Sequence, residues 1–385
     1  MKTRISAAVV LMAAMASPGA HAAPQVDVSA AKGLTLRWSE DLHMRLGTRL
    51  HADHVAFDDD VTPLPDDTGW RRARVASRID FRNWRLRADY DAGVSEGWKN
   101  LFIEYRGLER QRITAGNHMA PFSMEDTDGS SHMPLMERST ASALNPGMLT
   151  GISYRAWGNR WSIAGGVFEN ALNDLDRRQA DGTSVVARGT FAPVRRSGAI
   201  LHLGVSAEQR RVDDDLWVRL RARPFSRLAE RRLVDTGRIR NADGLTNLGL
   251  ELGASRSNMR LQAEAYRASV DAPGGAIDFA GHYVLASVNL GASAYRYSRS
   301  RGVFRGPRTR AAWGALELSA RYSRLDLEDR TVAGGAQVEK TLGASWTYND
   351  NLRLMLNVSE IEATPTRRGV EESVTVTALR VQLKI

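Results

Sequence analysis

Arginine is the residue type whose number and spacing could carry chemistry in this chain. Of 53 basic residues, 48 are arginine and only 5 are lysine. A guanidinium group pairs through two N–H bonds with phosphate or carboxylate oxygens, so rows of arginines predict binding of anions. Two runs place them at alternate positions: Arg72, Arg74 and Arg78, and Arg219, Arg221 and Arg223.

The composition excludes several classes of protein. The chain has 385 residues, a formal charge of +9, a mean hydropathy of −0.35 and no cysteine. Without cysteine there is no disulfide scaffold, thiolate zinc site or thiol nucleophile. After residue 22, no apolar run approaches the roughly 20 residues that a membrane-spanning helix needs.

The first 22 residues predict a cleaved secretory signal. Lys2 and Arg4 precede an apolar stretch over 5–16, and Ala20-His21-Ala22 matches a cleavage site. Removing the signal leaves a mature charge of +7, with 23–30 as a short periplasmic N-terminus. An exported chain is a poor candidate for binding nucleic acid inside a cell, so we expect no nucleic-acid partner.

The mature chain alternates between apolar and polar residues over long stretches. In 71–81 the odd positions are mostly apolar and the even positions mostly charged, and 84–91 repeats this after an Arg82-Asn83 turn. Successive side chains of a strand point to opposite faces, so each stretch predicts a strand with one apolar face. Similar alternation runs through 201–208, 217–223, 259–266, 316–322, 352–359 and 379–385.

The length of these strands favours an outer-membrane barrel over a soluble sandwich. Sandwich strands average about 5–6 residues, whereas membrane-barrel strands need about 9–11 and tolerate charge on their inner face. At about 45 residues per strand pair, the mature chain predicts about 16 strands and a water-filled lumen. We therefore expect an all-β transmembrane antiparallel barrel over 31–385, with surface loops at 58–68, 172–183, 223–246 and 298–310.

No other chemistry emerges from the sequence. The acidic runs 58–60 and 213–215 are consecutive, without the alternating ligands and glycine of a calcium loop. His118, His132 and Ser130-Ser131 could suggest a hydrolase, but no hydrolase, zinc-protease or nucleotide-binding motif accompanies them. We expect no catalytic residue, no metal site and no cofactor.

Ordered fragments of the chain resemble one family of porins. The shared order and spacing are specific, although each fragment is short, and the match runs from about Leu46 to the C-terminus and is densest over 46–210. The family is the phosphate- and polyphosphate-selective porins (the porin O/P family). The fragments are 47–53, 70–74, 83–90, 103–107, 115–117, 121–125, 136–139, 191–193 and 201–204.

The resemblance implies a trimer of sixteen-stranded barrels in the Gram-negative outer membrane, among lipid and lipopolysaccharide. It implies transport of small anions (phosphate, polyphosphate or chloride) along an arginine ladder matching Arg49, Arg72, Arg138, Arg219, Arg221 and Arg223. The alternation adds Arg74 and Arg78 to this pore-lining set. The resemblance also implies an inward-folded third loop that narrows the pore, with Phe122, Glu125, Asp126, His132 and Glu137 as its residues.

The chain departs from the family pattern at three places. Relatives carry lysines after the Phe-x-x-Glu segment, but 126–132 has none. Lys99 stands near a position where relatives often have an acid, and the chain ends on Ile385 instead of an aromatic residue. Selectivity for phosphate, for polyphosphate or for anions in general therefore stays open, and so does a barrel that acts as an adhesin or enzyme without an open channel.

Overall fold

The fold was analysed in a computed structural model. The predicted signal sequence and the acidic residues 213–215 lie outside the residues that it describes. Within those residues, no helix is long and apolar enough to cross a membrane, and no group of three or more side chains could hold a metal ion. The described residues are 23–29, 33–173, 182–196, 198–212, 217–291, 294–306, 311–329, 331–364 and 369–385.

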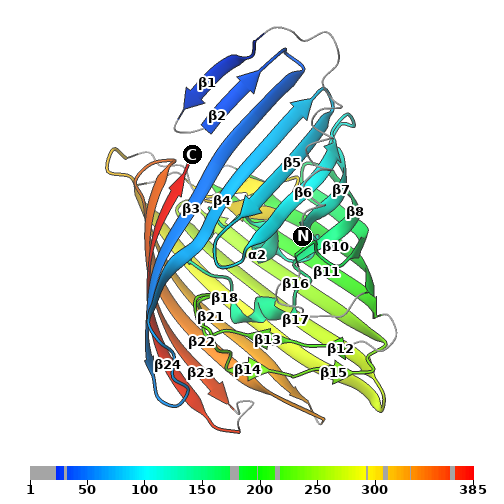
Figure 1. The fold of residues 1–385 in the computed structure, drawn as a ribbon, viewed down its shortest axis with the longest axis vertical. Helices are drawn as coiled ribbons and strands as arrows, with labels where there is room; N and C mark the ends of the chain where they lie inside the picture. Colours follow the sequence, from blue (N-terminus) through cyan, green and yellow to red (C-terminus); the bar gives the residue numbers. More distant parts are fainter. Residues whose placement is uncertain are drawn as a thin grey trace, which may run out of the picture.

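Sixteen antiparallel strands close into a barrel (Figure 1), which confirms the predicted fold class. The ring closes between its first and last strands, where Asp59 lies opposite Val374 and Arg49 opposite Lys384. The strands are β3 (Leu42–Asp59), β4 (Asp67–Phe81), β5 (Trp84–Asp91), β6 (Gly97–Tyr105), β7 (Gln111–Met119), β8 (Met148–Trp157), β9 (Trp161–Glu169), β10 (Gly182–Arg196), β11 (Ala199–Val212), β16 (Gly244–Arg256), β17 (Met259–Ala272), β18 (Gly275–Leu290), β21 (Ala315–Asp329), β22 (Val332–Thr347), β23 (Leu352–Thr364) and β24 (Glu372–Lys384).

A short hairpin extends the sheet beyond the ring. β1 (Gln25–Ser29) pairs with β2 (Gly33–Arg37), and β2 pairs with the first residues of β3. Just beside this pairing, the backbones of Thr48 and Ile385 exchange two hydrogen bonds, of 2.9 and 3.1 Å. The hairpin, the C-terminus and the Arg82-Asn83 turn mark one end of the barrel, which we call the short-turn end; the opposite end is the long-loop end.

The wall near the short-turn end is apolar outside and polar inside. In β24, Leu379, Val381 and Leu383 are exposed, whereas Arg380 and Gln382 are buried against the interior. A soluble protein would bury the apolar face instead. This reversed pattern is typical of a barrel whose outer face lies in lipid.

The pattern inverts toward the long-loop end. In the first half of β24, Val374, Val376 and Ala378 face inward and are fully buried, while Thr375 and Thr377 face outward. The last residues of β17, β21 and β23 show the same change. The apolar inner faces at this end pack into one hydrophobic cluster with residues of the 217–243 segment, so this segment covers the inner face of these strands.

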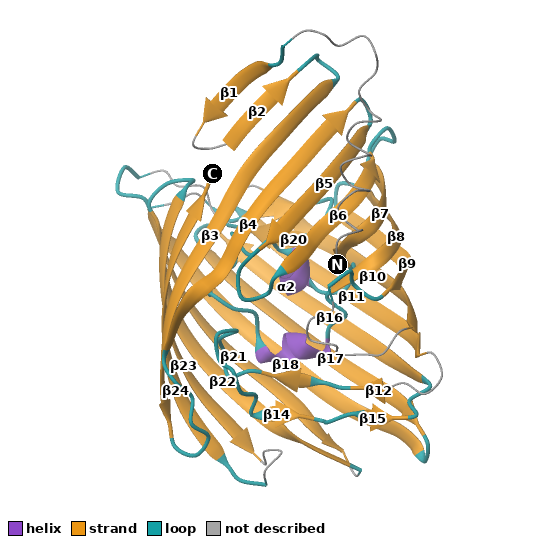
Figure 2. Ribbon diagram, viewed as in Figure 1, coloured by secondary structure: helices purple, strands orange, loops and turns teal. Residues whose placement is uncertain are grey.

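Three segments fold into the barrel (Figure 2). From the long-loop end come 120–147, with α2 (Met124–Thr127) and the 3-10 helix η1 (Thr140–Leu144), and 217–243, with four two-residue strands. The third, 294–306, comes from the short-turn end and forms the hairpin of β19 (Arg296–Ser298) and β20 (Val303–Arg305). The two-residue strands are β12 (Trp217–Val218), β13 (Arg221–Ala222), β14 (Val234–Asp235) and β15 (Ile239–Arg240).

Two predictions about these segments are wrong. The surface loops expected at 223–246 and 298–310 are inside the barrel over much of their described length, with Phe225, Val234 and Phe304 buried. The stretch 217–223 is not a barrel strand. Its residues do alternate, but the apolar side packs into the interior cluster instead of facing lipid. Alternation in the sequence is the same whether the apolar side faces lipid or the interior of the barrel.

Candidate functional site

A cavity of about 880 Å³ lies between the barrel wall and the inward segments. Fifteen arginines and two lysines line it, against six carboxylates. The barrel-strand residues in its lining come from β3 to β10, with Glu339 of β22 and Lys384 of β24. A cavity with such an excess of cations attracts anions and repels cations, because neither side chain charges nor ions are fully screened in a narrow, low-dielectric tube.

Arginines face one another directly across β3, β4 and β5. Arg45 lies opposite Arg78, which lies opposite Arg87, and Arg49 lies opposite Arg74. Like charges directly opposite each other on neighbouring strands destabilise a sheet. Asp91, Asp80 and Asp89 offset part of this repulsion at Arg74, Arg78 and Arg87, and a bound anion would offset more of it. We call these five arginines of β3, β4 and β5 the arginine wall.

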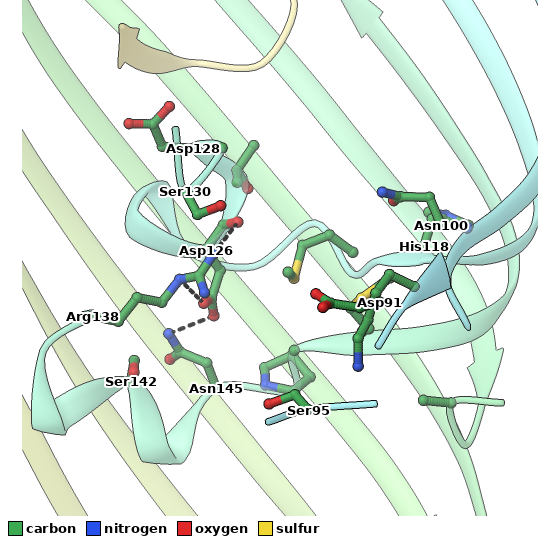
Figure 3. A pocket seen from close by; sticks show the side chains of 18 of the residues that line it. Asp91, Ser95, Asn100, His118, Asp126, Asp128, Ser130, Arg138, Ser142 and Asn145 are labelled. Carbon is green, nitrogen blue, oxygen red and sulfur yellow. Dashed lines mark hydrogen bonds and ion pairs between the residues drawn. The ribbon is translucent and has the colours of Figure 1, made fainter. Parts of the chain in front are cut away.

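Four of the predicted arginines are paired with carboxylates. Arg74 contacts Asp91 at 3.0 Å, Arg78 contacts Asp80 at 3.3 Å, and Arg138 contacts Asp126 at 2.8 Å. Figure 3 shows Arg138 and Asn145 both directed at Asp126, and the Asn145 amide donates to that carboxylate at 2.9 Å. The fourth, Arg219, forms a bidentate pair with Asp235. Each pairing cancels much of the charge that an anion would otherwise meet.

Arg49 and Arg72 have no such partner. Within the described part of the chain, neither has a carboxylate within 4.0 Å, and the Nε atom of each is buried without a hydrogen bond. Arg49 reaches only the Ser130 hydroxyl, at 3.5 Å. Both side chains line the cavity. Among the described residues, no carboxylate therefore pairs with these two cavity-lining guanidinium groups.

A β-bulge brings an additional arginine to the interior. The register of β3 and β4 shifts so that His51 lies opposite Arg72 and Ala52 opposite Trp70, which leaves Arg71 as the extra residue. Arg71 consequently faces inward together with Arg72, because a bulge places two residues opposite one. Arg71 forms a buried bidentate pair with Glu137. Strict alternation along 71–81 predicts that Arg71 lies on the apolar outer face, together with the other odd-numbered residues.

Glu137 connects the 120–147 segment to the seam of the barrel. Arg380 of β24 contacts Glu137 at 3.1 Å and Asp53 of β3 at 2.6 Å, and it donates to the Met136 carbonyl at 2.7 Å. Burial acts to raise the pKa of Glu137, but Arg71 and Arg380 outweigh it and hold that pKa well below its usual range. Glu137 therefore stays ionised and acts as an anchor.

Glu125 makes a second anchor on the opposite side of the same segment. Its carboxylate accepts from the Ser139 hydroxyl at 2.8 Å and lies 3.4 Å from Arg321 of β21. The N–H groups of Met124 and Glu125 donate to Glu264 of β17, at 2.7 and 2.9 Å. The segment is thus bonded to strands on both sides of the seam and crosses the interior.

The other residues predicted for this segment have different surroundings. Phe122 is buried beside Tyr266, with ring centroids 6.1 Å apart, and does not line the cavity. Asp126 and His132 do line it. Burial, together with Arg305, lowers the pKa of His132 to about 3, so this imidazole is neutral at physiological pH.

The carboxyl group of Asp128, which lines the cavity, changes its protonation state close to neutral pH. Burial raises the pKa of this carboxyl to about 6, against the opposing effect of Arg260 and Arg305. It is ionised at pH 7.5 and largely protonated at about pH 5. Acidification removes one negative charge, so the anion-to-cation permeability ratio should rise about twofold over this interval.

Zero-current potentials at the two pH values measure this effect. Asp128→Asn should keep the higher ratio at both values, because its amide cannot ionise. The chemically similar Asp66→Asn, in the loop between β3 and β4, serves as the control and should retain the pH dependence. A ratio that falls on acidification, or that still changes with pH in Asp128→Asn, would contradict this assignment.

The 217–243 segment adds arginines from within the barrel. Arg221 and Arg223 line the cavity and Arg219 does not, although all three were predicted on the lumen face of one strand. They do not share a barrel strand: Arg221 lies on the short strand β13, and Arg219 and Arg223 lie in irregular backbone beside it. Arg223 donates to the Ala229 carbonyl at 2.9 Å. The structure also brings in arginines that the sequence did not single out: Arg71, Arg87, Arg155, Arg188, Arg227, Arg232, Arg301 and Arg305.

Comparison with known proteins agrees with this architecture. The family model described as phosphate-selective porin O and P matches residues 44–385. The chain belongs to this family. The resemblance inferred from the sequence is therefore confirmed, and the protein is an outer-membrane porin; its family and fold support a channel and not an enzyme.

Individual relatives of this porin are distant. Porin O of Pseudomonas aeruginosa is 23% identical over 359 residues, covering 82% of each chain. In-vitro folded OmpT of Vibrio cholerae, solved in its trimer form, has a TM-score of 0.57 at 11% identity, with 90% of this porin and all of that chain covered. The anion-selective porin from Comamonas acidovorans gives 0.57 at 12%, with 89% and 100% covered. At this identity, the solved structures support the fold alone.

Proposed function

We propose that this porin is an anion-preferring diffusion channel whose physiological cargo is phosphate or polyphosphate. The observation that supports this most strongly is the excess of cations in the cavity, seventeen against six carboxylates. The description of the family and the name of the Comamonas neighbour point the same way. Phosphate is a suitable cargo because guanidinium groups pair with its oxygens in two-bond geometry.

Arg49 and Arg72 are the proposed central contacts for the anion. Both lack a carboxylate among the described residues and line the cavity from neighbouring strands. Arg74, Arg78, Arg138, Arg221 and Arg223 contribute to the surrounding potential. A row of moderate sites, as opposed to one tight site, lets an ion both enter and leave.

The 120–147 segment is proposed to be the constriction. Its buried carboxylates bond to the wall, and Asp126, His132 and Glu137 line the cavity. In place of lysines it offers hydroxyl residues that line the cavity, Thr127, Ser130 and Ser131, and the Ser130 hydroxyl lies 3.5 Å from Arg49. We infer a moderate affinity for phosphate, since hydroxyls donate hydrogen bonds without adding charge.

The proposal extends to the assembly and its surroundings. We propose a homotrimer embedded in outer-membrane lipid and lipopolysaccharide. The family resemblance implies a trimer, and OmpT of Vibrio cholerae was solved in a trimer form. We also propose that residues 1–22 are removed on export. Chemical cross-linking of the purified mature protein, read against its mobility in gels, tests the trimer.

Single-channel recording in planar bilayers tests the cargo. The mature protein should give open-channel steps in KCl, and added inorganic phosphate should reduce the chloride current, because both ions compete for the same arginines. Sulfate at equal ionic strength serves as the control for a divalent oxyanion. Absence of channel steps would contradict the channel, and a chloride current unaffected by phosphate would contradict phosphate as cargo.

A further inference from the structure

Two inward segments that come from opposite ends of the barrel meet in its interior. Met124 of α2 packs against Val303 and Phe304 of β20, and all three side chains are at most 1% exposed. Figure 2 shows β20 beside α2. Ile200 and Tyr297 pack against the same cluster. This small apolar contact is separate from the larger hydrophobic cluster around 217–243.

The hairpin of β19 and β20 is fixed to the wall by a buried arginine. Arg188 of β10 donates to the carbonyls of Arg301 and Gly302, at 2.6 and 2.8 Å. The same guanidinium pairs with both carboxylate oxygens of Glu251, at 2.6 Å each. A guanidinium group that forms several hydrogen bonds orients its partners, so Arg188 ties the tip of the hairpin to β10 and β16.

A second set of contacts fixes the aromatic side chains of the hairpin. His202 of β11 lies 2.6 Å from the Tyr297 hydroxyl and 3.0 Å from Glu251. Phe304 lies against Gly253 of β16 so closely that a Cβ atom at that glycine would come within 2.4 Å of the ring. The absence of a side chain at position 253 therefore makes room for Phe304, and the ring is directed toward α2.

The joined segments determine which part of the barrel borders the cavity. Strands β11, β16, β17 and β18 contribute no residue to the cavity lining. The 120–147 segment and the hairpin contact these strands and screen them from the cavity. The barrel strands that border the cavity are therefore mainly β3 to β10, which include most of the arginine wall. The hairpin also contributes Arg301 and Arg305 to the lining.

We propose that Met124, Val303 and Phe304 form a latch, which joins the two segments and confines the conducting path to the arginine wall. These are positioning residues: their apolar side chains do not need to touch the ion. Without the latch, the hairpin and α2 can separate and the path widens toward β11, β16 and β17. The buried inner faces of these strands carry glutamates as well as arginines: Glu208, Arg210, Glu251, Arg260 and Glu264. This inference rests on the proposed channel function.

Single-channel recording of latch variants tests the proposal. Met124→Ala combined with Phe304→Ala should raise the single-channel conductance about twofold and move the zero-current potential in a KCl gradient toward zero, because a wider path is less dominated by the arginines. Met124→Ala alone should change the conductance and the zero-current potential less than the double variant does. Met124→Leu, which keeps a large apolar side chain, should have the conductance and potential of the wild type. Global misfolding of the barrel would instead lower the conductance or abolish the channel steps.

The matched control removes apolar groups of similar size from the outer face of β16. Leu250→Ala with Leu252→Ala, both on exposed residues, should leave conductance and selectivity unchanged. Heat-modifiable mobility in gels verifies that each variant is folded. An unchanged or lower conductance in the folded Met124→Ala and double variants would overturn the latch, whereas a wild-type protein without channel steps would overturn the proposed function itself.

Discussion

Replacing Arg49 and Arg72 together by alanine should reduce the chloride and phosphate conductance of the channel at least about fivefold at low salt. A unit charge about 8 Å from an ion contributes about 2 kcal/mol at an effective dielectric constant of about 20. These two guanidinium groups have no carboxylate partner in the described residues and line the cavity. Their field therefore acts on the permeating ion without a directly paired carboxylate among those residues.

The control for this prediction is Arg219→Ala. Arg219 forms a bidentate pair with Asp235 and does not line the cavity, so its removal should leave conductance and selectivity nearly unchanged. Single-channel recording at low and high salt measures both variants, and the effect of Arg49→Ala/Arg72→Ala should weaken at high salt because of screening. Equal effects of the two variants would mean that unpaired charge does not govern conduction.

Replacing Arg380 by leucine should cost about 3 kcal/mol or more of unfolding free energy and loosen the 120–147 segment. Arg380 is about 3% exposed and contacts Asp53, Glu137 and the Met136 carbonyl. Its loss leaves one carboxylate without a cation and another with only Arg71. Both the closing seam between β3 and β24 and the anchor of the inward segment are affected.

Urea unfolding in lipid vesicles, followed by tryptophan fluorescence, measures the stability of this variant. The control is Lys340→Ala, because Lys340 pairs with Glu360 and Glu362 on the exposed outer face and such pairs contribute little. Arg380→Leu should also show larger fluctuations of the open-channel current. If its stability equalled that of Lys340→Ala, the buried network would not hold the seam.

The sequence predicts the barrel well because its signal is local. Alternation over about ten residues, as in 379–385, requires only that one face be apolar and the other polar. Chain length then limits the number of strands. The hairpin around Arg82-Asn83 also follows from local pattern, because a two-residue turn between alternating stretches leaves little freedom.

The interior of the barrel is harder to predict because it depends on contacts between distant segments. The run 217–223 alternates like a membrane strand, but its apolar side packs on inward-facing valines of β24 and neighbouring strands. The position of Arg71 depends on a bulge, and the pairing of Arg138 with Asp126 depends on how 120–147 folds. Residue types alone thus indicate many arginines on the inner face but not which ones remain uncompensated.

The excess of cations in the cavity predicts that the channel prefers anions to cations. The zero-current potential of the purified mature channel in a KCl gradient, at neutral pH and low ionic strength, measures that preference. We expect a potential close to the chloride equilibrium value, since seventeen cations against six carboxylates border the path. A potential on the potassium side of zero would contradict it.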